Sequence, residues 1–152
     1  ILIDVFKAVL ACWLGGVMFT PYGCPLEGKV LAGVAVMIGH DFPALLGFRG
    51  GKGLASYFGM VLALNWKLAL IVGAVIVLAT LITDFISVGA LSSIVVAPVY
   101  TFFTTHNLIL VAILGVATVV MFLKHWENII RIAKGQEIGL RRTAKGADRI
   151  DK

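Results

Sequence analysis

Apolar residues gather in six runs along the chain, separated by short polar or glycine-rich stretches. The runs cover residues 1–19, 30–46, 54–64, 68–83, 85–104 and 108–123. A helix needs about 20 residues to cross the hydrocarbon of a bilayer, so most of these runs are long enough once flanking residues are included. The pattern therefore predicts an all-α, polytopic helical membrane protein with six hydrophobic segments.

The run 54–64 is the shortest, and two interpretations of it are open. It can form a short helix paired with the next run across residues 65–67, or both runs can form one long tilted helix. The basic residues favour the pair. By the positive-inside rule, the basic loop at residues 49–52 and the basic C-terminal end should face the same side of the membrane. They do so only if four crossings, an even number, separate them. We therefore expect this loop and the tail to face the cytoplasm. The C-terminal basic residues are Lys124, Arg131, Lys134, Arg141, Arg142, Lys145, Arg149 and Lys152.

Composition agrees with a membrane protein and excludes several other classes. Hydrophobic residues make up 60% of the 152 residues and the mean hydropathy is +1.01, whereas a soluble domain of this size needs a polar shell. The net charge of +5 does not indicate a nucleic-acid partner, because the basic residues crowd toward one end without interleaved aromatics. Cys12 and Cys24 lack the spacing of a zinc or redox site, so neither a metal nor a cofactor is predicted.

Two charged residues lie inside the first run. Asp4 and Lys7 are three residues apart, so they share a helix face and can pair with each other. Pairing lowers the cost of placing charge in a membrane. Two roles remain open for them: a structural ion pair, or part of the wall of an active site.

A glycine-rich loop separates the second and third runs. Residues 47–56 read GFRGGKGLAS, with glycines at positions 47, 50, 51 and 53. Glycine allows positive φ and a close approach of backbone N–H groups to an anion, while Lys52 and Arg49 add positive charge. Lys52 is followed by Gly53 rather than by Ser or Thr, so the loop is not a Walker motif and nucleotide hydrolysis is not implied. The loop is predicted to bind a phosphate group.

Polar residues flank this loop in the predicted fold. His40 precedes the loop in GHDFP, and His125 and Asn128 follow the last run in KHWENIIR. Residues 125 and 128 share a helix face, while Glu127 lies off that face. Histidine can act as a general acid or base. Because the chain has no nucleophile elbow, we expect direct group transfer between two bound substrates, catalysed by positioning and charge stabilisation.

Three stretches resemble a known family. These are DVFK at residues 4–7, GHDFPALLGFRGGKGLAS at 39–56 and KHWENIIRIAKGQE at 124–137. They resemble the bacterial acyl-phosphate glycerol-3-phosphate acyltransferases, integral enzymes that begin phospholipid synthesis. The resemblance implies a seven-helix fold in the bacterial inner membrane and transfer of a fatty acyl group from acyl phosphate to the sn-1 hydroxyl of glycerol 3-phosphate. The product would be lysophosphatidic acid, and no cofactor or metal would be needed.

The same resemblance implies roles for individual residues. It places Lys52 and its neighbouring glycines in a phosphate-binding loop, and Ser87 in a cytoplasmic turn near the substrates. The expected catalytic residues are His40, His125 and Glu127. The expected substrate-binding residues are Arg49, Gly50, Gly51, Lys52, Gly53, Ser87 and Asn128.

The chain departs from the family pattern in two respects. Relatives begin with an additional helix and a polar loop, so the resemblance implies an N-terminally truncated member. In addition, Asp84 is acidic where relatives usually carry a basic residue. We expect residues 1–137 to form the membrane acyltransferase domain and residues 138–152 a basic cytoplasmic tail that contacts anionic membrane lipid.

A second class of function remains open. The chain can instead be a non-catalytic membrane binding protein or a transporter of a phosphorylated solute. A transporter typically shows internal repeats and a binding site at the midplane of the membrane. The sequence shows no such repeat, and its polar residues are predicted at one membrane face, which favours the enzyme.

Overall fold

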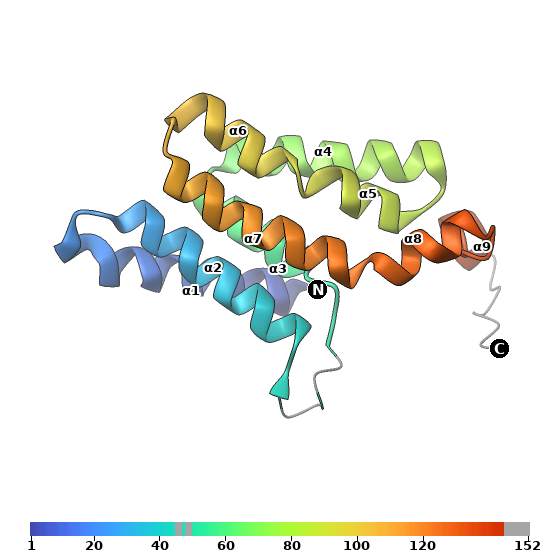
Figure 1. Ribbon diagram of the computed structural model, residues 1–152, viewed down its shortest axis with the longest axis horizontal. Helices are drawn as coiled ribbons and strands as arrows, with labels where there is room; N and C mark the ends of the chain where they lie inside the picture. The colour runs from blue at the N-terminus through green and yellow to red at the C-terminus, as the bar shows by residue number, and fades with distance from the viewer. Residues whose placement is uncertain (45–46, 48–49, 145–152) are drawn as a thin grey trace.

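The structure is a computed structural model that describes residues 1–44, 47 and 50–144, and these residues fold as a bundle of helices (Figure 1). No strand occurs in the described part, which confirms the all-α prediction. The elements are α1 (Leu2–Phe19), the 3₁₀ turn η1 (Thr20–Tyr22), α2 (Pro25–Asp41), α3 (Leu54–Leu64), α4 (Trp66–Thr83), α5 (Ile86–Ser93), α6 (Val96–Thr105), α7 (Leu108–Lys124), α8 (Trp126–Ala133) and α9 (Leu140–Ala144).

The helices form two groups joined by α7. In the first group α1 packs along α2 and α3, and in the second α4 packs along α5 and α6. Helix α7 lies between the groups, against α2 on one side and α6 on the other (Figure 1). The centre is filled by apolar side chains from both groups. Its largest fully buried members are Tyr57, Met37, Met60, Leu110, Leu114 and Met121.

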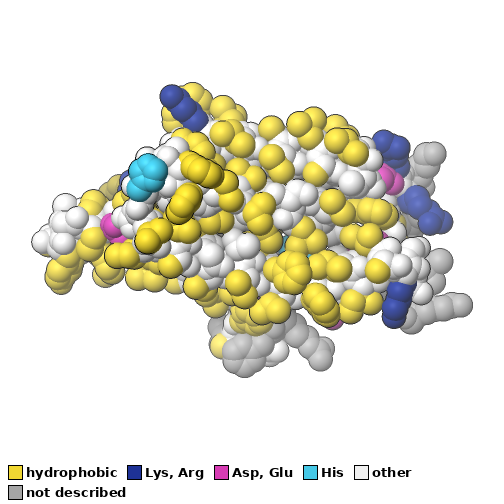
Figure 2. All heavy atoms as spheres, turned by 45° about the horizontal axis from the view of Figure 1, so that its top comes forward, with side chains coloured by type: hydrophobic (Ala, Val, Ile, Leu, Met, Phe, Trp, Pro, Cys, Tyr) yellow, Lys and Arg dark blue, Asp and Glu magenta, His cyan; other side chains and the backbone are white. Residues whose placement is uncertain are grey.

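The outer surface is also apolar, as expected where lipid is the solvent. Large hydrophobic side chains such as Leu70, Ile82 and Phe103 are exposed on the outside of the bundle. Figure 2 shows a face covered largely by hydrophobic side chains, with charged side chains toward the two ends. A water-soluble monomer rarely exposes so much contiguous apolar surface. The fold is therefore that of an integral membrane protein.

Length and composition identify the described helices that can span a bilayer. Three stretches qualify: Leu2–Tyr22, Trp66–Thr83, and α5 with α6 as Ile86–Thr105. Helices α7 and α8, bent by 48° at their junction, would together form a fourth. Within the described residues, most of each predicted apolar run lies on helix, but α3, with 11 residues, is too short to cross the hydrocarbon alone.

The second helix differs in its limits from the apolar run predicted over 30–46. It begins at Pro25, because proline suits the first turn of a helix, where its missing N–H is not needed. It ends at Asp41, because Phe42 precedes Pro43 and a residue before proline is disfavoured in the α conformation. Residues 45 and 46 of the predicted run lie outside the described residues.

The third and fourth runs form two helices rather than one long helix. Asn65 between them is extended, with φ −159° and ψ 116°, and its side chain accepts hydrogen bonds from the backbone N–H groups of Lys67 and Leu68 at 2.9 and 3.3 Å. This is an N-cap, which satisfies donors that the first turn of α4 leaves unpaired.

Both outer ends of this helix pair lie at the same end of the bundle. Lys52, just before α3, contacts Asn128 of α8, and Asp84, just after α4, contacts Leu140 of α9. Helices α3 and α4 are therefore antiparallel, as Figure 1 also shows, and the paired interpretation is the correct one.

The fifth run is broken into α5 and α6 by Pro98. Proline removes one N–H and clashes with the carbonyl group four residues earlier, here that of Ile94. The carbonyl oxygens left without helical partners receive hydroxyl donors from other helices. Tyr57 lies 3.2 and 3.3 Å from the carbonyl oxygens of Ser93 and Ile94, and Thr118 donates to that of Ile94 at 3.0 Å. Neighbouring hydroxyls are how membrane proteins tolerate such a break.

Glycines allow α1 and α2 to approach each other closely. Gly15 and Gly28 face each other across the pair, and a Cβ added to Gly28 would collide with the carbonyl oxygen of Gly15. Small residues at such crossings let helix backbones pack tightly, which drives association in membranes.

We predict that Gly28→Ala destabilises the protein by about 1–3 kcal/mol, because the collision involves backbone that must shift. Gly115→Ala is the control, since a Cβ at that position would meet nothing within 4 Å. The measurement is the thermal unfolding midpoint of each variant in the same detergent. Equal midpoints for the two variants would contradict the close approach of α1 and α2.

Candidate active site

The glycine-rich loop is pressed against the end of α2. The backbone N–H of Gly51 donates to the carbonyl oxygen of His40 at 3.3 Å. A Cβ on Gly50 would collide with that oxygen, and a Cβ on Gly51 would collide with the His40 ring. Gly53 adopts a φ of 77°, in the left-handed region, immediately before α3. Close approach and positive φ therefore require glycine at these three positions, as the sequence suggested.

His40 is held by the two charged residues of α1. Lys7 Nζ lies 3.0 Å from His40 Nδ1 and 2.8 Å from Asp4 Oδ1. An ammonium group can only donate, so Nδ1 accepts and the proton of a neutral imidazole lies on Nε2. Nε2 is the atom beside Gly51. The Asp4–Lys7 pair therefore forms as predicted, and it also orients a histidine toward the glycine-rich loop.

The end of α7 is fastened to the end of α2 next to the loop. Lys124 Nζ donates to the carbonyl oxygen of Asp41 at 2.7 Å and lies 4.6 Å from the centre of the Phe42 ring. Among the described residues, the two carboxylate oxygens of Asp41 have no hydrogen-bond partner; they are buried close to Gly53 at the start of α3. A helix N-terminus carries partial positive charge, which favours a carboxylate there.

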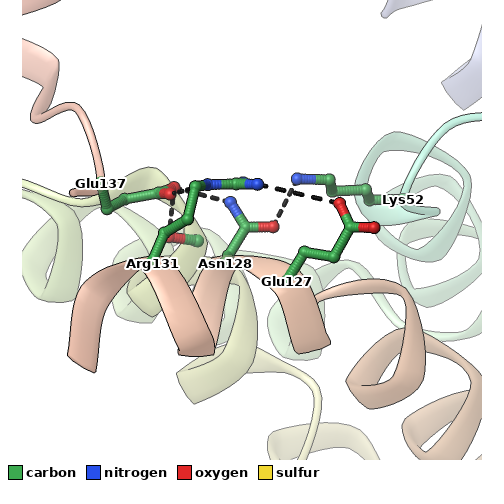
Figure 3. A network of polar contacts seen from close by, with 6 residues as sticks. Lys52, Glu127, Asn128, Arg131 and Glu137 are labelled. Atoms are coloured by element: carbon green, nitrogen blue, oxygen red, sulfur yellow. Dashed lines mark hydrogen bonds and ion pairs between the residues drawn. The ribbon is translucent and has the colours of Figure 1, made fainter. Parts of the chain in front are cut away.

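A second cluster joins the glycine-rich loop to the C-terminal segment (Figure 3). Lys52 Nζ donates to Asn128 Oδ1, and Asn128 Nδ2 donates to Glu137 Oε1 at 2.6 Å. Arg131 Nε donates to Glu137 Oε2 at 2.7 Å, and the Ser87 hydroxyl donates to Oε1 at 3.3 Å. We call these five residues, Lys52, Ser87, Asn128, Arg131 and Glu137, the polar network. It brings together side chains from the loop before α3, from α5 and from α8.

Glu137 is the acceptor at the centre of the polar network. Its burial tends to raise the pKa, but hydrogen bonds from Arg131, Asn128 and Ser87 outweigh this, so the pKa of Glu137 lies below its usual range. The carboxylate is therefore ionised near neutral pH. It fixes the orientation of Asn128, whose Nδ2 faces Glu137 and whose Oδ1 faces Lys52.

His125 lies at the junction of α7 and α8 and is buried. Its Nδ1 is 2.9 Å from the carbonyl oxygen of Met121. A carbonyl oxygen only accepts, so Nδ1 carries the proton and Nε2 of a neutral ring has a free lone pair. The two histidines thus hold opposite tautomers: His40 presents a donor at Nε2, and His125 presents an acceptor.

Glu127 differs from His40, His125 and Asn128 because its side chain is exposed. Its side chain is 86% accessible and its carboxylate lies 3.8 Å from Arg131 Nη1, one helical turn away. This agrees with the expectation that it lies off the face shared by His125 and Asn128, both of which are buried. Arg49 lies outside the described residues.

Sequence reasoning left Arg131 and Glu137 without assigned roles. Both were part of the stretch at 124–137 that carried the resemblance. Nothing in their spacing showed that Glu137 turns back toward α8 and α5. Within residues 1–44, 47 and 50–144, His, Cys, Asp and Glu side chains form no group of three or more that could hold a metal ion.

Comparison with known proteins adds independent information. The family described as glycerol-3-phosphate acyltransferase matches residues 1–135. The glycerol-3-phosphate acyltransferase of Brucella ovis is 38% identical over 111 residues, which cover 73% of this chain and 55% of that protein. The enzyme of that name from Mesorhizobium japonicum is 34% identical over 137 residues, covering 90% of this chain and 67% of that protein.

The fold also matches solved structures. One match is a crystal structure of PlsY (YgiH), an integral membrane glycerol 3-phosphate acyltransferase, in its glycerol 3-phosphate form. It superposes with a TM-score of 0.79 at 22% sequence identity, and the match covers 95% of this chain and 72% of that chain. The lysophosphatidic acid form gives a TM-score of 0.76 at 23% identity, covering 89% and 69%. At this identity the match shows that the fold is shared.

The fold and the clustered polar residues define an integral membrane protein with a polar site at one end of an apolar helix bundle. The match over residues 1–135 shows the family. The chain belongs to the glycerol-3-phosphate acyltransferase family. It spans about half the length of the Brucella relatives, covering 55% of the Brucella ovis protein.

We predict a pH-dependent contribution of Glu137 to stability. Folding lowers the pKa of the Glu137 carboxylate, so its ionised form stabilises the folded state. This stabilisation is complete above the pKa of the unfolded state, about 4.3 for glutamate. It is lost as the pH falls through the lower pKa of the folded state. The difference in thermal midpoint between the unmodified protein and Glu137→Gln should stay constant from pH 8 to about 5 and shrink below about 4. A difference that persists unchanged at lower pH would contradict this role.

Proposed function

We propose that the protein is an integral membrane acyltransferase that moves a fatty acyl group from acyl phosphate to the sn-1 hydroxyl of glycerol 3-phosphate, giving lysophosphatidic acid and phosphate. The observation that carries the proposal is the contact between Lys52 of the glycine-rich loop and Asn128 of the polar network. It brings a phosphate-binding motif and polar side chains together at one end of an apolar bundle. The names of the matched relatives support the same reaction.

The glycine-rich loop is proposed to bind phosphate. Lys52 supplies a positive charge, the start of α3 carries partial positive charge toward the same region, and glycine lets the loop lie close to the end of α2. His40 Nε2–H, beside Gly51, is a further donor. We propose that Arg49 contributes a second cation. These groups would stabilise the negative charge that the departing phosphate acquires as its bond to the acyl carbon breaks.

Acyl transfer requires one bond to form and one to break. The sn-1 oxygen of glycerol 3-phosphate attacks the acyl carbon, the bond from this carbon to the phosphate oxygen breaks, and the hydroxyl proton passes to a base. Two bases are open: Nε2 of His125, which holds a lone pair because Nδ1 donates to Met121, and the phosphate of the donor itself.

The polar network is proposed to position the second substrate. Ser87 and Asn128 can hydrogen-bond hydroxyl and phosphate oxygens, and Glu137 holds both in place. Glu127 is the weakest candidate for a catalytic role because of its exposure, and we propose that it acts through its neighbour Arg131. Binding both substrates in a fixed geometry supplies much of the catalysis in such a reaction.

We propose that the apolar bundle lies in the bacterial inner membrane, with the glycine-rich loop and the tail on the cytoplasmic side. Residues 1–137 would then form the membrane acyltransferase domain and residues 138–152 a basic tail at the surface of the lipid. The shared position of Lys52, Asp84 and Glu137 at one end of the bundle supports this topology. It places the site where both a lipid and a water-soluble substrate can reach it.

The test is acyl transfer from acyl phosphate to labelled glycerol 3-phosphate in membranes that lack other acyltransferases. It is run with this chain and with the chain preceded by the N-terminal helix and polar loop that the family resemblance implies. Labelled lysophosphatidic acid from either form supports the proposal. Correct insertion without product in both forms would contradict it and favour a membrane binding protein or a transporter.

Lys52→Ala serves as the site variant in this assay, with Lys67→Ala as its matched control at the opposite end of the bundle. Removing the charge from the loop should raise the KM for a phosphorylated substrate or abolish turnover, while insertion stays normal. Lys67, beside Trp66 at the start of α4, should be replaceable without effect. Normal kinetics for Lys52→Ala would exclude phosphate binding by the loop.

His125→Ala distinguishes the two candidate bases. General acid–base catalysis typically contributes about 10²–10⁴-fold, so we expect kcat to fall by at least a hundredfold if His125 accepts the proton. The measurement is kcat at saturating concentrations of both substrates. A loss of about twofold or less would remove His125 from the reaction and leave the donor phosphate as the base.

A further inference from the structure

Asp84, the acidic residue in the turn between α4 and α5, holds the beginning of the C-terminal tail. It adopts a φ of 67°, and its carbonyl oxygen accepts from the N–H of Leu140 at 2.7 Å. Its Oδ1 accepts from the N–H of Arg141 at 3.0 Å. Gly139 passes so close that an added Cβ would collide with the Asp84 carboxylate. Asp84, at which the sequence departs from the family pattern, therefore makes specific contacts with residues 139–141 of the C-terminal segment.

The side chain of Arg141 adds a weaker attachment. Its Nε lies 3.8 Å from Asp84 Oδ1, and its Nη2 donates to the carbonyl oxygen of Leu81 at 3.2 Å. The arginine side chain is 74% exposed, so solvent screens this ion pair. The bond from the Arg141 backbone N–H to the carboxylate is the stronger contact, since an ionised acceptor strengthens a hydrogen bond.

The segment held by Asp84 is the one that supplies Glu137. After α8 the chain reverses at Gly135, where φ is 66°, and returns toward α5. Glu137 then enters the polar network, and two residues later Gly139 reaches Asp84. Residues 137–141, which we call the strap, are therefore fastened at two points. Ordering each residue of a free segment costs about 1–2 kcal/mol of conformational entropy, which the attachment at Asp84 helps to offset.

We propose that Asp84 is a positioning residue of the acyltransferase site: it fastens the strap, so that Glu137 is held where it orients Asn128 and Ser87. This inference rests on the proposed function, because Asn128 and Ser87 are the groups assigned to substrate binding. Asp84 itself acts through Glu137 and does not touch the substrates.

Three substitutions test the role of the carboxylate. Asp84→Gly removes the side chain while glycine keeps the positive φ without strain. Asp84→Asn keeps an oxygen acceptor, and asparagine tolerates this backbone conformation. Arg142→Ala is the matched control, because Arg142 is an exposed basic neighbour in the same segment.

Asp84→Gly should lower kcat/KM for glycerol 3-phosphate about tenfold, the effect of losing one hydrogen bond to a charged group. Asp84→Asn should restore most of the activity, and Arg142→Ala should match the unmodified protein. Hydrogen exchange at the backbone N–H of Arg141 should become faster in Asp84→Gly. An unchanged kcat/KM, or unchanged exchange, would overturn the proposal.

The double variant Asp84→Gly/Glu137→Gln separates positioning from general stability. If Asp84 acts through Glu137, adding Asp84→Gly to Glu137→Gln leaves kcat/KM unchanged. Independent losses that multiply would show a merely structural role and overturn the inference. If the active form of the protein transfers acyl groups and Asp84→Gly does so equally well, only this inference fails. If neither this chain nor its N-terminally extended form makes product, the proposed function fails as well.

Discussion

The carboxylate of Glu137 is the group on which the geometry of the candidate site depends. It accepts hydrogen bonds from α5 and from α8, and through Asn128 it is linked to the loop before α3. A partly buried carboxylate is costly unless it is well paired. The three donors that meet this requirement come from two helices, Ser87 from α5 and both Asn128 and Arg131 from α8, so the same pairing that lowers the cost assembles the site.

The bilayer imposes a second constraint, which explains why polar side chains occur where they do. Within the apolar bundle, the hydroxyls of Tyr57 and Thr118 serve backbone carbonyls released by the break at Pro98. At the end of the bundle, lysines and histidines instead surround a loop rich in glycine. Polar groups in the interior therefore complete the backbone hydrogen bonding, whereas those at the end are available for chemistry.

Apolar runs predicted the helices well because burial in lipid leaves a strong signal in the sequence. The antiparallel pairing of α3 and α4 also followed from the distribution of basic residues. The limits of α2 and the break between α5 and α6 were not predicted, because both depend on the stereochemistry of Pro25, Pro43 and Pro98 rather than on hydropathy.

The site was predictable in part, for a similar reason. Short motifs identified Lys52 and Asn128, which the structure brings into contact. The contacts of Glu137 and Asp84 were not predicted because they arise from the reversal of the chain after α8, and residue spacing carries no information about such long-range contacts. Lys7 was noticed as half of an ion pair, but its contact with His40 required the packing of α1 against α2.

The short third helix has a consequence for the depth at which Lys52 lies. Helices α3 and α4 start from the same break at Asn65, but α3 has 11 residues and α4 has 18. At 1.5 Å per residue, α3 ends about 10 Å short of α4 along the bundle. The start of α3, with Gly53 and Lys52 just before it, therefore lies deeper in the bundle than the end of α4. In the proposed reaction, a lipid-borne donor can then stay at the depth it occupies in the bilayer, and the water-soluble acceptor is the partner that must descend and shed its hydration.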